Sequence, residues 1–223
     1  EARLIYLGIL QGLPVYDKRI LLIDIGGGST ELLVGEKGEI LFSTSLKLGA
    51  IRLTEKYLKN DPLSMLDLQK CRIHIESVLT AFLPQIEKWK PFQVVGSSGS
   101  ITSITSMVLE RKGEKRDRLN GYEFSYDQFK EVRKAVLDAE SVKKRLKIPG
   151  LEAKRADIIV GGVLVLDEVL HRLKALGIQM CLAISPRKDI LPTILRGVLP
   201  GILHLKTTHA GARALTLCVC LYL

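Results

Sequence analysis

The chain has 223 residues, of which 47% are apolar and 26% are charged, and it carries a formal net charge of +9. These values are ordinary for a globular protein, and they leave room for one large domain or two small ones. The four cysteines show no CxxC spacing, and they are too few in a chain of this length for a disulfide-stabilised fold. The sequence therefore argues against a disulfide scaffold and against a zinc ribbon.

The positive charge favours a polyanionic partner such as nucleic acid, polyphosphate or a membrane surface. Basic residues cluster over 111–118 and 143–147, but aromatic side chains suited to base stacking are scarce. Nucleic acid is therefore not the expected partner. The chain opens at Glu1 without a charged-then-apolar leader, and it contains no apolar run of membrane-spanning length. We therefore expect a cytoplasmic protein without a membrane partner, excerpted from a longer chain.

The first segments in chain order are the end of a helix over residues 1–12 and a strand over 19–25. Three consecutive glycines and two hydroxyl residues follow, and a second apolar run occupies 32–34. This pattern predicts a strand, a tight turn and a strand.

The predicted turn is suited to an anion. Gly26, Gly27 and Gly28 allow positive φ and leave no Cβ between the backbone and a ligand, so several main-chain N–H groups can converge on phosphate. The hydroxyls of Ser29 and Thr30 add donors. The alternative is an ordinary glycine-rich hairpin turn. We weigh it less because two residues suffice to join two strands and three glycines are conformationally costly.

Two acidic residues bracket this turn. Asp24 precedes the turn and Glu31 follows it, so both carboxylates project from the same end of the hairpin. A divalent cation bound to phosphate, or a water molecule, would sit there. We expect Asp24 and Glu31 to hold Mg²⁺ directly or through water.

A third strand over 40–46 follows a second turn. Three successive antiparallel strands are the opening of a ribonuclease-H-like domain. A helix is predicted from Gly49 to about residue 59, and Ser64 can cap the next helix. The apolar residues of that second helix recur at helical spacing and predict an amphipathic face: Leu66, Ile73, Val78, Leu79 and Phe82.

A short buried strand over 92–95 is predicted to end in a loop of small residues before a helix restarts at Ile101. Free N–H groups and a helix dipole would meet an anion there, although small residues also serve simply to pack a strand end against a helix. The proposed phosphate-binding residues of this loop are Gly96, Ser97, Ser98, Gly99 and Ser100.

The remaining predicted elements are helices over 125–147 and 152–175 and a strand over 178–184. Gly161 and Gly162 lie inside the second helix, where each costs about 1 kcal/mol relative to alanine, so we expect another backbone to approach closely there. Residues 190–223 contain no Asp or Glu. One hypothesis for this tail is an altered reading frame or a non-homologous ending.

The segment from Asp24 to Glu31 resembles the second phosphate-binding motif of the exopolyphosphatase and guanosine pentaphosphate phosphatase family, within the actin and sugar-kinase superfamily. Three other stretches agree with the family in order and spacing, and the resemblance runs from residue 1 to about residue 186. The three stretches begin at Glu1-Ala2-Arg3, at Gly96-Ser97-Ser98 and at Arg155-Ala156-Asp157.

The resemblance implies an α/β fold: a ribonuclease-H-like, actin-like ATPase domain whose mixed sheet opens in three antiparallel strands and is flanked by helices. Residues 1–18 would be the end of a preceding, largely absent first domain, and residues 19–186 the second, phosphate-binding domain. Residues 187–223 form an atypical tail, because Arg187-Lys188-Asp189-Ile190 replaces the leucine-arginine-glutamate-glycine motif with which the family continues.

The resemblance also implies a function. The chain would be a phosphoanhydride hydrolase that releases terminal phosphate from polyphosphate or guanosine pentaphosphate, with Mg²⁺ as cofactor. Glu1 aligns with the family's catalytic glutamate and would activate water, and Glu31 is the second candidate catalytic residue. No second Asp-Ile-Gly-type segment occurs in the chain, so we expect half of the cleft, and full activity, to require an upstream domain.

Two other functions remain open: a non-catalytic phosphate- or nucleotide-binding module, and a relative of the sugar or acetate kinases. A homodimer is also left open.

Overall fold

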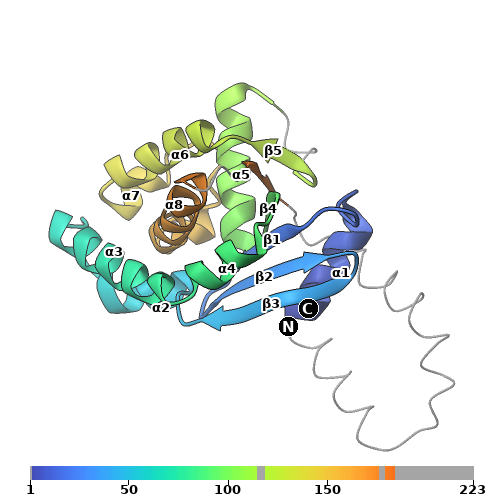
Figure 1. Cartoon of the computed structure of the whole chain (residues 1–223). Helices are drawn as coiled ribbons and strands as arrows, with labels where there is room; N and C mark the ends of the chain where they lie inside the picture. The colour runs from blue at the N-terminus through green and yellow to red at the C-terminus, as the bar shows by residue number, and fades with distance from the viewer. Residues whose placement is uncertain (1, 115–118, 176–178, 184–223) are drawn as a thin grey trace, which may run out of the picture. The chain divides into compact units, whose positions relative to one another are not determined.

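The computed structural model of the protein describes residues 2–114, 119–175 and 179–183. The described strands are β1 (Ile20–Ile25), β2 (Thr30–Glu36), β3 (Glu39–Leu46), β4 (Gln93–Ser97), β5 (Tyr122–Phe124) and β6 (Gln179–Ala183). The helices are α1 (Ala2–Gly12), α2 (Ala50–Tyr57), α3 (Met65–Thr80), α4 (Leu83–Trp89), α5 (Ser98–Lys112), α6 (Tyr126–Asp138), α7 (Val142–Arg145) and α8 (Ile159–Ala175), with a 3₁₀ turn at Ala153–Arg155 (Figure 1).

The described strands form one mixed sheet in the order β3-β2-β1-β4-β6-β5. The strands β1, β2 and β3 form an antiparallel meander. β4 lies parallel to β1, β6 lies parallel to β4, and β5 runs antiparallel to β6 at the edge. The predicted mixed sheet with three antiparallel opening strands is therefore confirmed, whereas β5 was not predicted.

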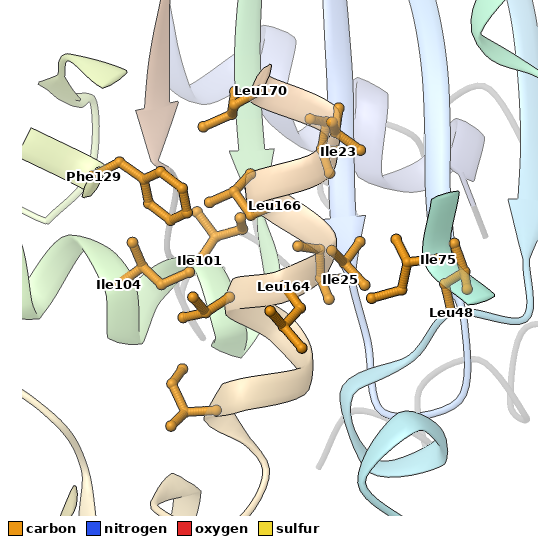
Figure 2. Close-up of a cluster of buried hydrophobic side chains, with 14 of the residues drawn as sticks. Ile23, Ile25, Leu48, Ile75, Ile101, Ile104, Phe129, Leu164, Leu166 and Leu170 are labelled. Carbon is orange, nitrogen blue, oxygen red and sulfur yellow. The ribbon is translucent and has the colours of Figure 1, made fainter. Parts of the chain in front are cut away.

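The sheet buries both of its faces. On one face, Ile23 and Ile25 of β1 pack against α8 and its neighbouring helices in the larger apolar core (Figure 2). On the other face, Tyr6 and Ile9 of α1 cover a smaller apolar cluster. Because side chains alternate along a strand, β1 contributes to both clusters and reads as a continuous apolar run.

The buried face of α3 agrees with the prediction at Leu79 and differs from it in the first half of the helix. Leu66 is 56% exposed and Ile73 is 58% exposed, whereas the buried positions are Cys71, Ile75 and Leu79. These three positions recur every fourth residue and form one ridge, and α3 packs that ridge towards α8. Cys71 is a free thiol, and burial raises its pKa to about 12.

Two predicted helices are shorter than expected. The segment 125–147 is divided into α6 and α7, because Ser141 begins a new helix by accepting a hydrogen bond from the Lys144 N–H at 3.3 Å. The segment 152–175 begins with a 3₁₀ turn, and α8 starts only at Ile159. The predicted cap at Ser64 is confirmed by reciprocal hydrogen bonds with Asp67.

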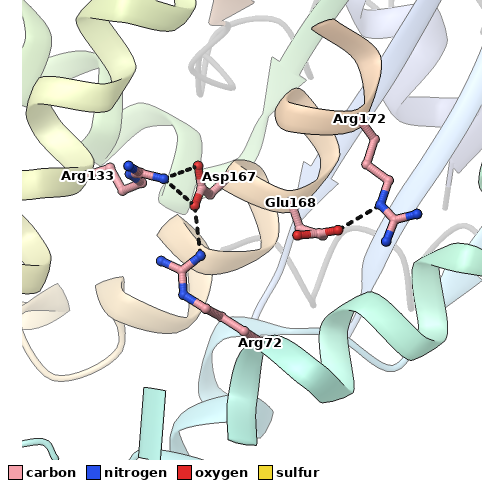
Figure 3. A network of polar contacts seen from close by, with 5 residues as sticks. All are labelled: Arg72, Arg133, Asp167, Glu168 and Arg172. Carbon is pink, nitrogen blue, oxygen red and sulfur yellow. Dashed lines mark hydrogen bonds and ion pairs between the residues drawn. The ribbon is translucent and has the colours of Figure 1, made fainter. Parts of the chain in front are cut away.

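Helix α8 is also held by ion pairs. The side chain of Asp167 is 4% exposed, and it accepts hydrogen bonds from Arg72 of α3 at 3.1 Å and from Arg133 of α6 at 2.8 and 2.9 Å (Figure 3). A second pair joins Glu168 to Arg172 at 2.7 Å on a more exposed side of the helix. Asp167 thus connects three helices on one face of the sheet.

Replacing Asp167 by Asn should lower the free energy of unfolding by about 2 kcal/mol, because two guanidinium groups lose a buried anionic acceptor. Urea denaturation measures this effect. Glu168→Gln is the matched control on the same helix, and its more exposed pair should contribute less than about 1 kcal/mol. Equal losses in the two variants would contradict a special role for Asp167.

Candidate functional site

The glycine-rich segment forms the predicted hairpin turn. β1 and β2 pair antiparallel as far as Ile25 and Thr30, and the turn Gly26–Ser29 joins them. The N–H of Gly26 donates to the carbonyl oxygen of Ser29 at 2.9 Å and closes the turn. The strand, turn and strand predicted here are confirmed.

The first turn of α2 binds the carbonyl groups of this turn. The N–H of Ala50 donates to the Gly26 oxygen at 2.9 Å, and the N–H of Arg52 donates to the Gly27 oxygen at 3.1 Å. The Nε of Arg52 donates to the Gly28 oxygen at 2.8 Å. Three successive carbonyl groups therefore point towards α2.

The N–H groups of the same peptides point the other way, because the C=O and N–H of a trans peptide lie on opposite sides. These are the N–H groups of Gly27, Gly28 and Ser29, and none of them has an acceptor within the part of the chain that the structure describes. Three adjacent donors on one side of a turn are an arrangement that can bind an anion.

The glycines serve close approach here, rather than the predicted positive φ. Positive φ occurs at other described glycines but not at Gly26, Gly27 or Gly28. A Cβ on Gly49, which precedes α2, would lie 2.2 Å from the Gly27 oxygen. A Cβ on Gly27 would lie 2.8 Å from the Ile51 side chain. The turn therefore excludes a side chain at Gly49, whereas a side chain at Gly27 would require the Ile51 side chain to move.

The two bracketing carboxylates lie side by side. Asp24 pairs directly with Glu31 across the hairpin, so both side chains project from the same face of the sheet. Ser45 of β3 and Ser97 of β4 occupy the same row. Glu31 is 6% exposed, and its Oε1 accepts hydrogen bonds from Ser29 Oγ at 2.6 Å and from Ser45 Oγ at 2.9 Å. The hydroxyls hold this carboxylate in one orientation beside the turn.

This acidic pair suits a hard cation that keeps several ligands from outside the protein. Within the described residues, no group of three or more His, Cys, Asp or Glu side chains is placed to hold a metal. Mg²⁺ commonly binds through one or two carboxylates together with phosphate oxygens and water. Asp24 and Glu31 fit that mode.

The predicted loop over residues 96–100 is absent, because β4 runs to Ser97 and α5 begins directly at Ser98. Ser98 makes this sharp junction with φ +89°, which is unusual for a residue other than glycine. Its hydroxyl donates to the Ile25 oxygen at 2.9 Å and accepts from the Ile25 N–H at 3.2 Å. This hydroxyl joins α5 to the start of the glycine turn.

Sequence reasoning missed one residue at this junction. A Cβ on Gly99 would lie 1.7 Å from Arg155 Nη2, so the guanidinium of Arg155 occupies the space over the first turn of α5. Arg145 fixes the neighbouring backbone: it is 2% exposed, and its Nε donates to the Ala156 oxygen at 2.6 Å. Arg155 lies in one of the matching family stretches, which was the available signal.

The paired glycines of α8 lie against the start of α2 and the start of α5. A Cβ on Gly161 would lie 2.9 Å from the Ala50 oxygen of α2, and a Cβ on Gly162 would lie 2.9 Å from the Ser100 Cβ of α5. The predicted close approach of another backbone is confirmed at Gly161, whereas Gly162 approaches the side chain of Ser100. α8 thereby packs directly behind the first turns of both α2 and α5.

The predicted site residues divide by exposure. The partly or largely exposed ones can meet a ligand directly: Asp24, Gly26, Gly27, Gly28, Ser29, Ser98 and Gly99. The buried ones support the site from within: Thr30, Glu31, Gly96, Ser97 and Ser100. The hydroxyl of Thr30, expected as a phosphate donor, instead donates to the Leu48 oxygen at 2.9 Å. Glu1 lies outside the described residues.

Comparison with known proteins gives one family. The family model for Ppx/GppA phosphatases matches residues 1–191. The chain is 29% identical over 177 residues to a guanosine-5'-triphosphate,3'-diphosphate pyrophosphatase of Vibrio vulnificus, covering 78% of this chain and 33% of that protein. It is 26% identical over 174 residues to exopolyphosphatase 2 of Mycobacterium tuberculosis, covering 78% of this chain and 54% of the relative.

A solved structure shows the same likeness. The crystal structure of an exopolyphosphatase from Cytophaga hutchinsonii superposes with a TM-score of 0.76 at 30% sequence identity, over 88% of this chain and 63% of that one. The chain spans only part of the curated relatives it matches, between 27% and 54% of their length.

Replacing Gly49 by Ala should weaken binding of Mg²⁺-pyrophosphate at least about tenfold, which corresponds to about 1.4 kcal/mol. The added methyl group would push the turn away from α2 and disperse the three N–H groups. Titration calorimetry measures the affinity. Gly12→Ala is the matched control, because no atom lies within 4 Å of its added Cβ. Unchanged affinity in Gly49→Ala would mean that contact with α2 does not shape the anion site.

Proposed function

Because the chain belongs to the Ppx/GppA phosphatase family, we propose that it binds the terminal phosphate of polyphosphate or guanosine pentaphosphate and contributes to its hydrolytic release. The observation that carries this proposal is the row of three turn N–H groups that find no acceptor among the described residues, beside two facing carboxylates. Relatives named as an exopolyphosphatase and as a guanosine pentaphosphate pyrophosphatase support a phosphoanhydride substrate.

In the proposed mechanism, the turn binds the terminal phosphoryl group that is transferred to water. The N–H groups of Gly27, Gly28 and Ser29 would donate to its oxygens and stabilise the negative charge that concentrates there during transfer. These donors are oriented before substrate arrives, because the carbonyls of the turn are fixed on α2. Arg155 at the first turn of α5 would add positive charge near the same end of the sheet.

The carboxylates would hold the cation. Asp24 and Glu31 present oxygens on one face of the sheet, and Glu31 is kept in place by the Ser29 and Ser45 hydroxyls. When bound, Mg²⁺ would neutralise phosphate charge. The assignment of Glu1 as the base that activates water rests on the family resemblance alone.

We also propose the domain organisation that the resemblance implies. Residues 19–186 would form the phosphate-binding domain, and residues 1–18 would lead into it from a first domain that supplies the opposite wall of the cleft. The packing of α1 on the sheet through Tyr6 and Ile9 supports a fixed connection at this point. Residues 187–223 lie outside the described residues.

The proposed setting is cytoplasmic. The described residues include no helix with both the length and the apolar character needed to cross a membrane. Sedimentation of the purified chain would determine whether it forms the homodimer that the sequence leaves open.

Replacing Glu31 by Gln should reduce Mg²⁺-dependent phosphate release from long-chain polyphosphate at least about a hundredfold. The melting temperature should change little, because the amide oxygen can still accept from Ser29 and Ser45. Glu55→Gln is the control, since Glu55 is an exposed carboxylate on α2.

Unchanged turnover in Glu31→Gln would remove Glu31 from the mechanism. The wild-type chain separates the alternative functions in the same assay. Binding of polyphosphate without release, both by this chain and by a version that carries the upstream domain, would indicate a binding module. Transfer of phosphate from ATP to a sugar or to acetate, without release from polyphosphate, would indicate a kinase.

A further inference from the structure

Arg52 supplies two donors to the glycine turn. Its main-chain N–H binds the Gly27 oxygen and its side-chain Nε binds the Gly28 oxygen. The main chain of α2 reaches the first two carbonyl groups of the turn, and the third is bound by this side chain. The guanidinium therefore extends the row of donors at the start of α2 by one position.

The third carbonyl group determines the direction of one anion donor. The oxygen of Gly28 and the N–H of Ser29 belong to the same planar peptide, so fixing one fixes the other. Gly28 is also the most exposed part of this turn, since Gly26, Gly27 and Ser29 are half-buried. Without Arg52, the Gly28–Ser29 peptide would have no partner to hold it among the described residues.

The hydrogen bond from Arg52 to the Gly28 oxygen also has a charged donor. A hydrogen bond from a guanidinium is stronger than one between neutral groups, and hydrogen bonds in series polarise one another. A cation on the Gly28 oxygen therefore makes the Ser29 N–H a better donor to an anion on the opposite side. An exposed arginine in this position contributes little to global stability, so its effect should be concentrated on the site.

We propose that Arg52 is a positioning residue for phosphate: it orients and polarises the Gly28–Ser29 peptide, so that Ser29 N–H completes the anion site. This inference rests on the proposed function, and it assigns a role in that function to a side chain outside the phosphate-binding motif. The expected ligand is the terminal phosphate of a phosphoanhydride, contacted by the peptide rather than by the guanidinium.

The test uses the whole chain and Mg²⁺-pyrophosphate as the probe. Arg52→Ala should weaken binding about tenfold with little change in melting temperature. Lys56→Gln removes one exposed positive charge from the same helix, one turn further on, and should bind like the wild type. Millimolar guanidinium ion should restore part of the affinity of Arg52→Ala and leave Lys56→Gln unchanged.

Amide NMR identifies the affected peptide. In the wild type, the N–H signals of Gly27 and Ser29 should both shift on addition of pyrophosphate. In Arg52→Ala, the Ser29 response should be lost while the Gly27 response persists, because Gly27 N–H belongs to the peptide held by Ala50.

Three results would overturn the inference: unchanged affinity in Arg52→Ala, equal weakening in Lys56→Gln, or a Ser29 response that survives the substitution. A wild-type chain that binds no pyrophosphate would instead refute the proposed function, and this inference with it.

Discussion

The contact between α2 and the glycine turn is the constraint on which the candidate site depends. Donors at the start of α2 bind the carbonyl groups of Gly26, Gly27 and Gly28, and this leaves the N–H groups of the turn directed outwards. The contact requires Gly49, where any Cβ would collide with the turn. It also requires that α2 be fixed from behind, and Gly161 of α8 allows that by approaching the α2 backbone. Helix α8 thereby supports the site without contributing a side chain to it.

The placement of negative charge next to an anion site follows from the sheet register. Asp24 and Glu31 are neighbours on the face that α1 covers, next to N–H groups that favour phosphate. Two carboxylates beside the turn would repel a phosphate unless a cation lay between them. The hydroxyls of Ser29 and Ser45 donate to Glu31 Oε1 and orient this carboxylate. The arrangement is therefore coherent for a metal-bound phosphate and poor for phosphate alone.

Local sequence signals predicted the hairpin, the acidic pair and the cap of α3, because each is specified by residues adjacent in the chain. The buried face of α3 was predicted correctly at Leu79 and wrongly at Leu66 and Ile73, because packing on α8 buries Cys71 and Ile75 instead. The contacts of Arg52 and Arg155 could not be predicted from local sequence, since each depends on a glycine distant in the chain, Gly28 and Gly99. For Arg155 the family resemblance was the one available signal. The glycine run suggested φ freedom, whereas none of its three glycines has a positive φ. The close backbone approach at this turn occurs at Gly49, outside the run.

Binding and turnover depend on different parts of this chain. The proposed anion site is built from contacts within residues 24–52, and α8 packs behind that segment through Gly161. Water activation depends instead on a base, assigned by resemblance to Glu1, and catalysis requires that base to be held within hydrogen-bond distance of the attacking water. Correct positioning of reacting groups is worth about 7 kcal/mol or more in well-oriented systems. A chain that keeps the turn but lacks a rigid opposite wall should therefore lose turnover before it loses affinity for phosphate.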